Sequence, residues 1–215
     1  MSAAARPRAP ATDASGMLSG APKRFYDPRI GMYTVRLQPG ECYATAALDE
    51  TIVTVLGSCV AACIRDPRKG FGGMNHFMLP ESESGEWSGV SAALRYGNHA
   101  MEMLINAVLR TGCPRQYLEI KLFGGANLND GPSKVGSKNA SFALNYLKAE
   151  GLTSIANDLG SNHPRVIHYV PSTGAARRIF RKRVEEDQIV VESERRYNAK
   201  LKVAPATGGD VELFE

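Results

Sequence analysis

The first apolar runs of the chain predict three consecutive strands. Residues 51–56 form a β-branched run, residues 60–64 form a second, and residues 72–79 form a third that Pro80 stops. A turn-rich connection at residues 65–70 separates the second run from the third. The three strands are therefore close in sequence and are expected to be close in space.

Two later segments repeat their apolar residues at helical spacing. Residues 92–109 place apolar residues on one face, and Gly112 and Pro114 follow the last of them. Residues 135–150 give a second amphipathic helix, with Gly151 just past its end. One apolar face on each helix indicates that both pack against a sheet.

Several further apolar runs complete the pattern with more strands. The resulting order is three strands, a helix, a strand, a helix and then several strands. This order predicts an α/β or α+β fold, in which a single layered domain has a mixed β-sheet core with packed helices. The further strands are expected at residues 118–123, near Ile155, at residues 166–169 and at residues 177–184.

Composition divides the 215 residues into a folded part and two tails. Residues 1–25 are rich in Ala, Pro, Arg, Ser and Gly without an apolar period, which predicts a disordered N-terminal extension. Residues 201–215 are expected to form a flexible C-terminal tail, and residues 26–200 to form the domain. With 43% apolar and 22% charged residues, a buried core is expected.

Charge and hydropathy exclude several classes of function. The net charge of +4 is mild, and the one dense basic cluster, residues 177–183, is typical of a solvated edge strand. A docking patch for an acidic partner is the second interpretation of this cluster, and no nucleic-acid partner is expected. No apolar run approaches the ~20 residues that span a bilayer, and no secretory signal is expected from the N-terminal composition. Four cysteines are too few for a disulfide framework, so a reducing, cytoplasmic setting is expected.

One cysteine and one histidine carry the candidate chemistry. Cys59 follows Gly57 and Ser58, and a turn of small residues exposes a sulfur and leaves backbone N–H groups free to hold an oxyanion. His76 ends the third apolar run and could act as the general base, if the two strands are neighbours in one sheet. The alternatives are a small buried cysteine and a hydrogen-bonded core histidine.

Metal and phosphate sites are not predicted. Cys59, Cys63 and His76 do not suggest zinc, because strand residues four apart lie ~13 Å from each other. Neither Gly72-Gly73 nor Gly124-Gly125 opens a phosphate-binding motif. We therefore expect no cofactor, and expect these glycine pairs to let backbones approach closely at strand ends, beside the thiol.

The segments around this pair resemble the chemoreceptor glutamine deamidase family, CheD. The resemblance covers roughly residues 30–185 of the chain. It is carried by Leu56-Gly57-Ser58-Cys59-Val60-Ala61, by Gly73-Met74-Asn75-His76-Phe77-Met78-Leu79-Pro80, by Lys121-Leu122-Phe123-Gly124-Gly125-Ala126, by Gly136-Ser137-Lys138-Asn139-Ala140 and by shorter matches as far as Arg165.

The resemblance implies an enzyme, a protein-glutamine glutaminase. Cys59 would attack the side-chain carboxamide of a receptor glutamine, His76 would pass the proton to departing ammonia, and water would hydrolyse the thioester. It also implies a fold similar to the deamidase domain of the cytotoxic necrotizing factor toxins. The implied partners are methyl-accepting chemotaxis receptors and a CheC-type phosphatase.

The position of the third catalytic residue departs from the family pattern. In the family it is a Thr six residues before the cysteine, where this chain has Val53, and Thr54 is the expected substitute. Neighbouring strand residues face opposite sides, so either a bulge brings Thr54 to the site or another group orients His76. Val53 keeps open a chemotaxis-array adaptor with weak or lost deamidase activity. A cysteine peptidase or transglutaminase-like acyl transferase would use the same nucleophile.

Overall fold

The computed structural model describes residues 22–79, 90–128, 134–180 and 184–203, and its strands form two mixed sheets. Most of the predicted N-terminal extension and C-terminal tail lie outside the described residues, while residues 23–25 belong to a strand and residues 201–203 to a helix. The outer sheet has the order β1 (Lys23–Asp27), β2 (Met32–Arg36), β4 (Glu50–Leu56), β9 (Arg165–Val170), β10 (Ala175–Phe180). The inner sheet has the order β3 (Cys42–Thr45), β6 (Phe71–Asn75), β5 (Val60–Asp66), β7 (Glu119–Gly124), β8 (Ala156–Leu159).

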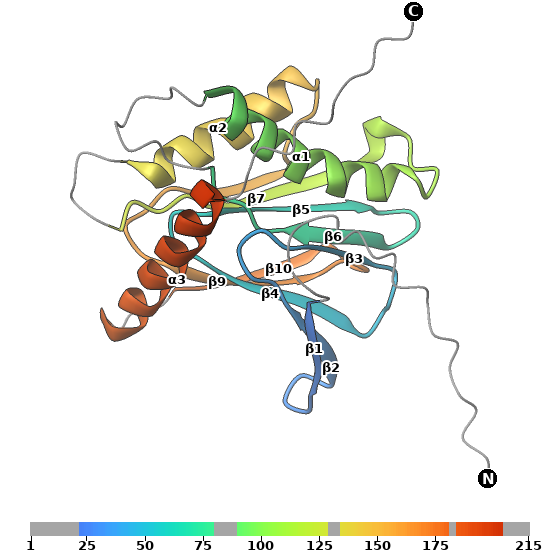
Figure 1. The fold of residues 1–215 in the computed structure, drawn as a ribbon. Coiled ribbons are helices and arrows are strands. Elements are labelled where there is room, and N and C mark those ends of the chain that lie inside the picture. The colour runs from blue at the N-terminus through green and yellow to red at the C-terminus, as the bar shows by residue number, and fades with distance from the viewer. Residues whose placement is uncertain (1–21, 80–89, 129–133, 181–183, 204–215) are drawn as a thin grey trace, which may run out of the picture.

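The elements stack as three layers, with the inner sheet between the outer sheet and two helices. Helices α1 (Val90–Leu109) and α2 (Val135–Ala149) cover one face of the inner sheet, and a third helix, α3 (Val184–Val203), lies at one end of the two sheets (Figure 1). Strand β5 is therefore buried on both faces, which explains its unbroken apolar sequence from Val60 to Ile64.

Two apolar cores hold the layers together. The first lies between the inner sheet and the helices, where side chains such as Ile64, Leu104 and Phe142 meet. The second lies between the two sheets and contains Ile52, Cys59 and other fully buried side chains. Cys59 thus belongs to the apolar layer between the sheets, where water is excluded.

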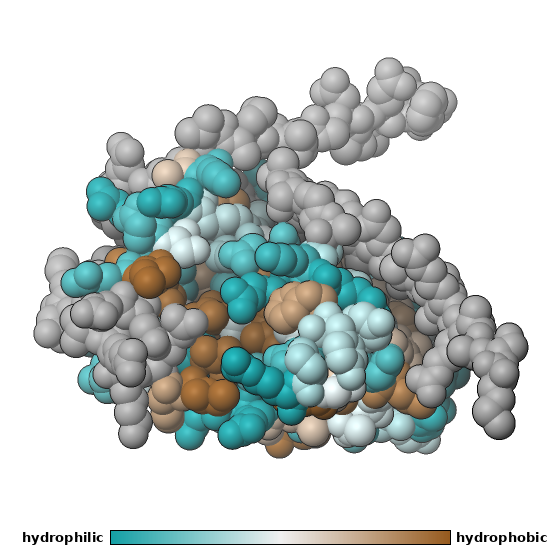
Figure 2. Space-filling model, turned by 90° about the horizontal axis from the view of Figure 1, so that it is seen from below, coloured by the Kyte–Doolittle hydropathy of each residue, from teal (hydrophilic) through white to brown (hydrophobic). Residues whose placement is uncertain are grey.

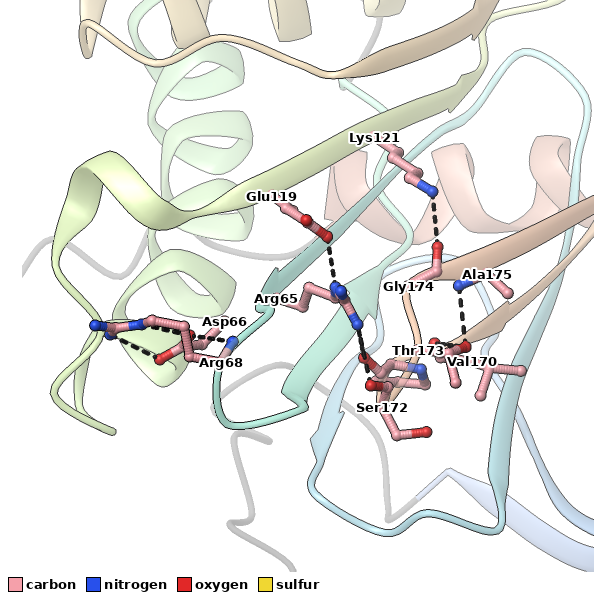
Figure 3. Close-up of polar contacts among 11 residues, drawn as sticks. Arg65, Asp66, Arg68, Glu119, Lys121, Val170, Ser172, Thr173, Gly174 and Ala175 are labelled. Carbon is pink, nitrogen blue, oxygen red and sulfur yellow. Dashed lines mark hydrogen bonds and ion pairs between the residues drawn. The ribbon is translucent and has the colours of Figure 1, made fainter.

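Polar contacts join the two sheets at one end. Arg65 on β5 donates to the carbonyls of Pro171 and Ser172 in the β9–β10 turn, and also pairs with Glu119 on β7 at 2.6 Å (Figure 3). Lys121, also on β7, donates to the carbonyl of Gly174 in the same turn at 2.7 Å. These contacts fix how the outer sheet lies on the inner one.

The far face of the outer sheet carries no layer of helices in the described part of the chain, although Ile189 and Val190 of α3 line a pocket there together with Val53. In the view from below, hydrophobic residues appear on this side among hydrophilic ones (Figure 2). Phe25 on β1 and Ile179 and Phe180 on β10 are exposed large apolar residues of this sheet. Among the described residues, no helix is long and apolar enough to cross a membrane.

Several predicted elements are confirmed and two are corrected. Both amphipathic helices form where they were expected. The expected strand at 177–184 is wrong at its end, because β10 stops at Phe180, residues 181–183 lie outside the described residues, and Val184 begins α3. The expected strand at 72–79 is too long, because β6 ends at Asn75 and only an isolated bridge at Phe77 continues the pairing.

Candidate active site

The register of β5 against β6 brings Cys59 and His76 together. Val60 and Phe77 exchange two backbone hydrogen bonds of 2.9 Å, so Ala61 lies opposite His76 and Cys59 is its diagonal neighbour on the same face. The Cys59 sulfur, a ring nitrogen of His76 and a carboxylate oxygen of Glu194 all lie within 4.8 Å of one another. The expectation that the two strands are neighbours in one sheet is confirmed.

Thr54 reaches His76 from the facing sheet. It shares the interior face of β4 with Ile52 and Leu56, and its Oγ1 lies 2.7 Å from Nδ1 of His76. The strand pairs regularly with β9 along this stretch, so no bulge is required. Val53 points to the opposite face by the ordinary alternation of a strand.

A second hydrogen bond of Thr54 sets the tautomer of His76. Its Oγ1 donates to the carbonyl of Leu37 at 3.0 Å, and a hydroxyl has only one hydrogen to donate. Nδ1 of His76 must then carry the proton that Oγ1 accepts, which leaves the lone pair on Nε2. Within the described part of the chain, Nε2 is buried and has no hydrogen-bond partner.

Burial keeps His76 neutral. The side chain is only 2% exposed, and this burial lowers the pKa of His76 to about 4, although the charge of Glu194 opposes the shift. A neutral imidazole with a free Nε2 lone pair is the form that accepts a proton from a thiol.

Neighbouring N–H groups hold the turn at Gly57-Ser58-Cys59 in place through hydrogen bonds to its carbonyl oxygens. The three carbonyls accept hydrogen bonds from Ala126 N at 2.8 Å, Asn139 Nδ2 at 2.9 Å and Gly125 N at 2.7 Å respectively. Because these groups fix the carbonyls, the three backbone N–H groups of the turn point the other way and converge on one place.

Gly124 and Gly125 are needed for this approach. Both have positive φ, and a Cβ on Gly124 would collide with the carbonyl oxygen of Cys59. The expectation that this glycine pair lets a backbone approach beside the thiol is confirmed.

The converging N–H groups bind the carboxylate of Glu194 from α3. Oε1 accepts from Gly57 N at 2.9 Å and Cys59 N at 3.2 Å. Oε2 accepts from Ser58 N at 2.9 Å and from the Ser58 hydroxyl at 2.6 Å. The turn therefore binds an anion beside the sulfur, as an oxyanion hole does.

The same surroundings keep the Cys59 thiol protonated. Burial raises the pKa of Cys59 well above its ordinary value, and the nearby Glu194 carboxylate raises it further. In this arrangement the sulfur is a weak nucleophile until a base removes its proton or its surroundings change.

Cys59, His76 and Glu194 also offer the types of ligand atom that a zinc ion accepts. Both Glu194 oxygens, however, accept hydrogen bonds from the turn. Cys63, the other thiol considered for a metal, lies in the core between the sheets. That the chain holds no metal or cofactor stays a prediction.

Two polar residues of the site were missed by the sequence. Asn139 was recognised only as part of a motif, yet its amide joins the Ser58 carbonyl to Leu79 N, which donates to Oδ1 at 2.9 Å. Glu194 lies on a helix that was not predicted, in a segment with few apolar residues. Val190 and Tyr197 lie four residues before and three residues after Glu194, and this helical spacing is a signal that could have indicated the helix.

Comparison with known proteins gives consistent matches. The family described as "CheD chemotactic sensory transduction" matches residues 78–178. The probable chemoreceptor glutamine deamidase CheD of Rhodopseudomonas palustris (strain BisA53) is 48% identical over 192 residues, which is 89% of each chain. The protein of the same name from Halorhodospira halophila is 47% identical over 195 residues, again 89% of each chain.

Proposed function

The chain belongs to the CheD family, and on this basis we propose that it is a chemoreceptor glutamine deamidase. It converts glutamine side chains of methyl-accepting chemotaxis receptors to glutamate and releases ammonia, as a cysteine hydrolase of carboxamide bonds. One observation carries the assignment to these residues. Cys59 lies beside a neutral His76, and Thr54 holds Nδ1 of that histidine. The N–H groups of the turn bind a carboxylate oxygen of Glu194 where the carbonyl oxygen of a substrate would lie.

The first half of the reaction forms a thioester. The glutamine carboxamide takes the place of the Glu194 carboxylate, so that its carbonyl oxygen accepts from the N–H groups of the Gly57–Cys59 turn. Nε2 of His76 accepts the thiol proton while the Cys59 sulfur attacks the carbonyl carbon. The imidazolium then gives this proton to the amide nitrogen, the C–N bond breaks, and ammonia leaves.

The second half restores the enzyme. A water molecule gives a proton to Nε2 of His76 and attacks the thioester carbon, and the C–S bond breaks. The sulfur recovers its proton from His76, and glutamate is released. The sum is one carboxamide and one water converted to one carboxylic acid and one ammonia, which balances without any cofactor.

Thr54 acts through His76 rather than on the substrate. It holds the ring with Nδ1 protonated, so that the nitrogen left for the thiol is the basic one. This contact supplies the orienting group that Val53 would otherwise leave missing. It therefore favours an active deamidase over an adaptor with weak or lost deamidase activity.

The finer expectations from sequence belong to this proposal. We propose that the layered domain has the fold of the cytotoxic necrotizing factor deamidase domain, that it spans residues 26–200, and that it acts in the cytoplasm. A CheC-type phosphatase is proposed as a second partner. The Cys59–His76 pair at one end of two packed sheets supports the fold proposal, and superposition of a solved structure on such a toxin domain tests it.

Ammonia release tests the reaction class. The full chain is incubated with a purified receptor cytoplasmic fragment, and ammonia, peptide cleavage and incorporation of an added amine are measured together. We expect ammonia alone, with loss of release in Cys59→Ala and retention in Cys63→Ala, whose thiol is also fully buried but lies outside the site. Cleavage of the fragment would indicate a peptidase, and amine incorporation without hydrolysis a transferase.

A further inference from the structure

The group that Glu194 brings to the turn has the chemistry of the reaction product. The deamidated side chain of a substrate glutamine is a glutamate carboxylate, and Glu194 is such a carboxylate, only 6% exposed and bound by the N–H groups of Gly57, Ser58 and Cys59. These are the donors that a substrate carbonyl needs. A substrate and Glu194 therefore cannot occupy the turn together.

Glu194 is presented from a helix that has few anchors. Among the described side chains of α3, only Val190 and Glu194 are buried. Tyr197 is half-buried, packs on the bare α-carbon of Gly40, and pairs its hydroxyl with that of Tyr96. These residues follow each other at spacings of four and three, which is one narrow stripe on a helix. So small an apolar contact is typical of an element that opens locally.

Open space lies on both sides of α3 where Glu194 enters the site. A pocket of about 330 Å³ lies on one side of Glu194, with His76 and Thr54 in its wall. A pocket of about 220 Å³ lies on the other side, with Ser58 and Met78 in its wall. The site thus extends on both sides beyond the contact that Glu194 makes with the turn.

We propose that α3 is an internal product mimic: it holds Glu194 in the substrate site, and a substrate helix must displace it to place a glutamine there. This inference rests on the proposed function. It also defines the substrate class, which is a glutamine on the face of a helix, with an apolar residue four positions before it and an aromatic or apolar residue three positions after it. Those are the positions of Val190 and Tyr197 relative to Glu194.

In the free enzyme, the mimic also keeps the Cys59 thiol buried and protonated. With α3 in place, Cys59 is fully buried and its thiol stays protonated, because burial and the Glu194 carboxylate both raise the pKa of Cys59. Displacement of α3 removes the carboxylate and admits solvent. The thiol then becomes easier to ionise when a substrate helix arrives.

Glu194→Gln turns the mimic into an internal substrate and gives a direct test. The full-length variant is purified, and its mass and peptide map show whether the introduced amide has become an acid. We expect conversion back to the wild-type mass, and retention of the amide in the double variant Glu194→Gln/Cys59→Ala. Glu192→Gln is the matched control, because Glu192 is half exposed on the same helix and should keep its amide.

Thiol reactivity gives a second readout that does not depend on catalysis. In Glu194→Ala we expect alkylation of Cys59 by iodoacetamide to be at least about tenfold faster than in wild type. The variant loses all four hydrogen bonds that the carboxylate accepts, and the net loss of even one charge-assisted bond shifts an opening equilibrium about tenfold. Alkylation of Cys63 and the rate for Glu192→Ala should not change. Circular dichroism confirms that each variant is folded.

The outcomes separate this inference from the proposed function. If wild type deamidates a receptor fragment while Glu194→Gln keeps its amide and Glu194→Ala leaves Cys59 unreactive, the mimic is refuted and the function stands. If Glu194→Gln converts itself but no receptor fragment is deamidated, the mimic stands and the receptor assignment fails. If neither reaction occurs, the alkylation rate of Cys59 decides for or against the mimic.

Discussion

Thr54→Val removes one oxygen from between two buried groups and should reduce both activity and stability. Oγ1 accepts from Nδ1 of His76 at 2.7 Å and donates to the carbonyl of Leu37 at 3.0 Å. Valine has nearly the same shape, so the change removes hydrogen bonds without opening a cavity. An unpaired buried polar group costs about 1–3 kcal/mol, so two of them should lower the free energy of unfolding by about 2–6 kcal/mol.

The effect on catalysis follows from the freedom that His76 gains. Without Oγ1, the imidazole can rotate or carry its proton on Nε2, and both states remove the base from the thiol. General base catalysis contributes about 10²–10⁴-fold, so partial loss of orientation should lower kcat about 10–100-fold with little change in KM. Thr54→Ser keeps the oxygen and should restore most of the rate.

The assay measures kcat and KM for ammonia release from a receptor fragment, with urea unfolding of each variant alongside. The informative control is Val53→Thr in the Thr54→Val background, which restores a threonine at the position that the family resemblance favours. Because residue 53 faces away from His76, this double variant should stay slow. Wild-type kcat in Thr54→Val, or rescue by Val53→Thr, would refute the proposed role of Thr54.

Two further predictions concern stability. Because burial lowers the pKa of His76 to about 4 while the unfolded value is 6.5, the unfolded state binds more protons between these pH values. The free energy of unfolding should therefore fall by up to about 3 kcal/mol as pH drops from 6.5 to 4, and His76 should contribute little further change below pH 4. In urea unfolding, His76→Gln should lack this dependence on pH. Gly124→Ala should cost about 2–4 kcal/mol, since φ is 111° and the new Cβ meets the Cys59 carbonyl. Gly151→Ala, at φ 64° in open space, should cost only about 1 kcal/mol, and equal losses in thermal unfolding would contradict the argument.

The sequence was sufficient where local pattern decides the structure. The two amphipathic helices and the central strands follow from apolar periodicity, and the Cys59–His76 pair follows once β5 and β6 are antiparallel neighbours. What the pattern could not show is that the strands divide into two sheets. That division depends on pairings between distant segments, such as the parallel pair β2–β4 and the antiparallel pair β4–β9.

The same limit explains what the sequence left open at the site. Which face of β4 turns inward depends on the second sheet, so Thr54 could not be placed from its own strand. Glu194 lies 135 residues after Cys59, on a polar helix whose apolar stripe is too narrow to be recognised. Its role depends on the N–H groups of the turn at Gly57, which only the folded chain brings to it.

Site-resolved mass spectrometry of a receptor cytoplasmic fragment tests the central claim most directly. The fragment is incubated with wild type, with Cys59→Ala and with Cys63→Ala, and every glutamine is assigned as amide or acid. The account predicts conversion of specific helical glutamines to glutamate by wild type and Cys63→Ala, and none by Cys59→Ala. Equal conversion by wild type and Cys59→Ala, or no conversion by any of the three, would contradict it.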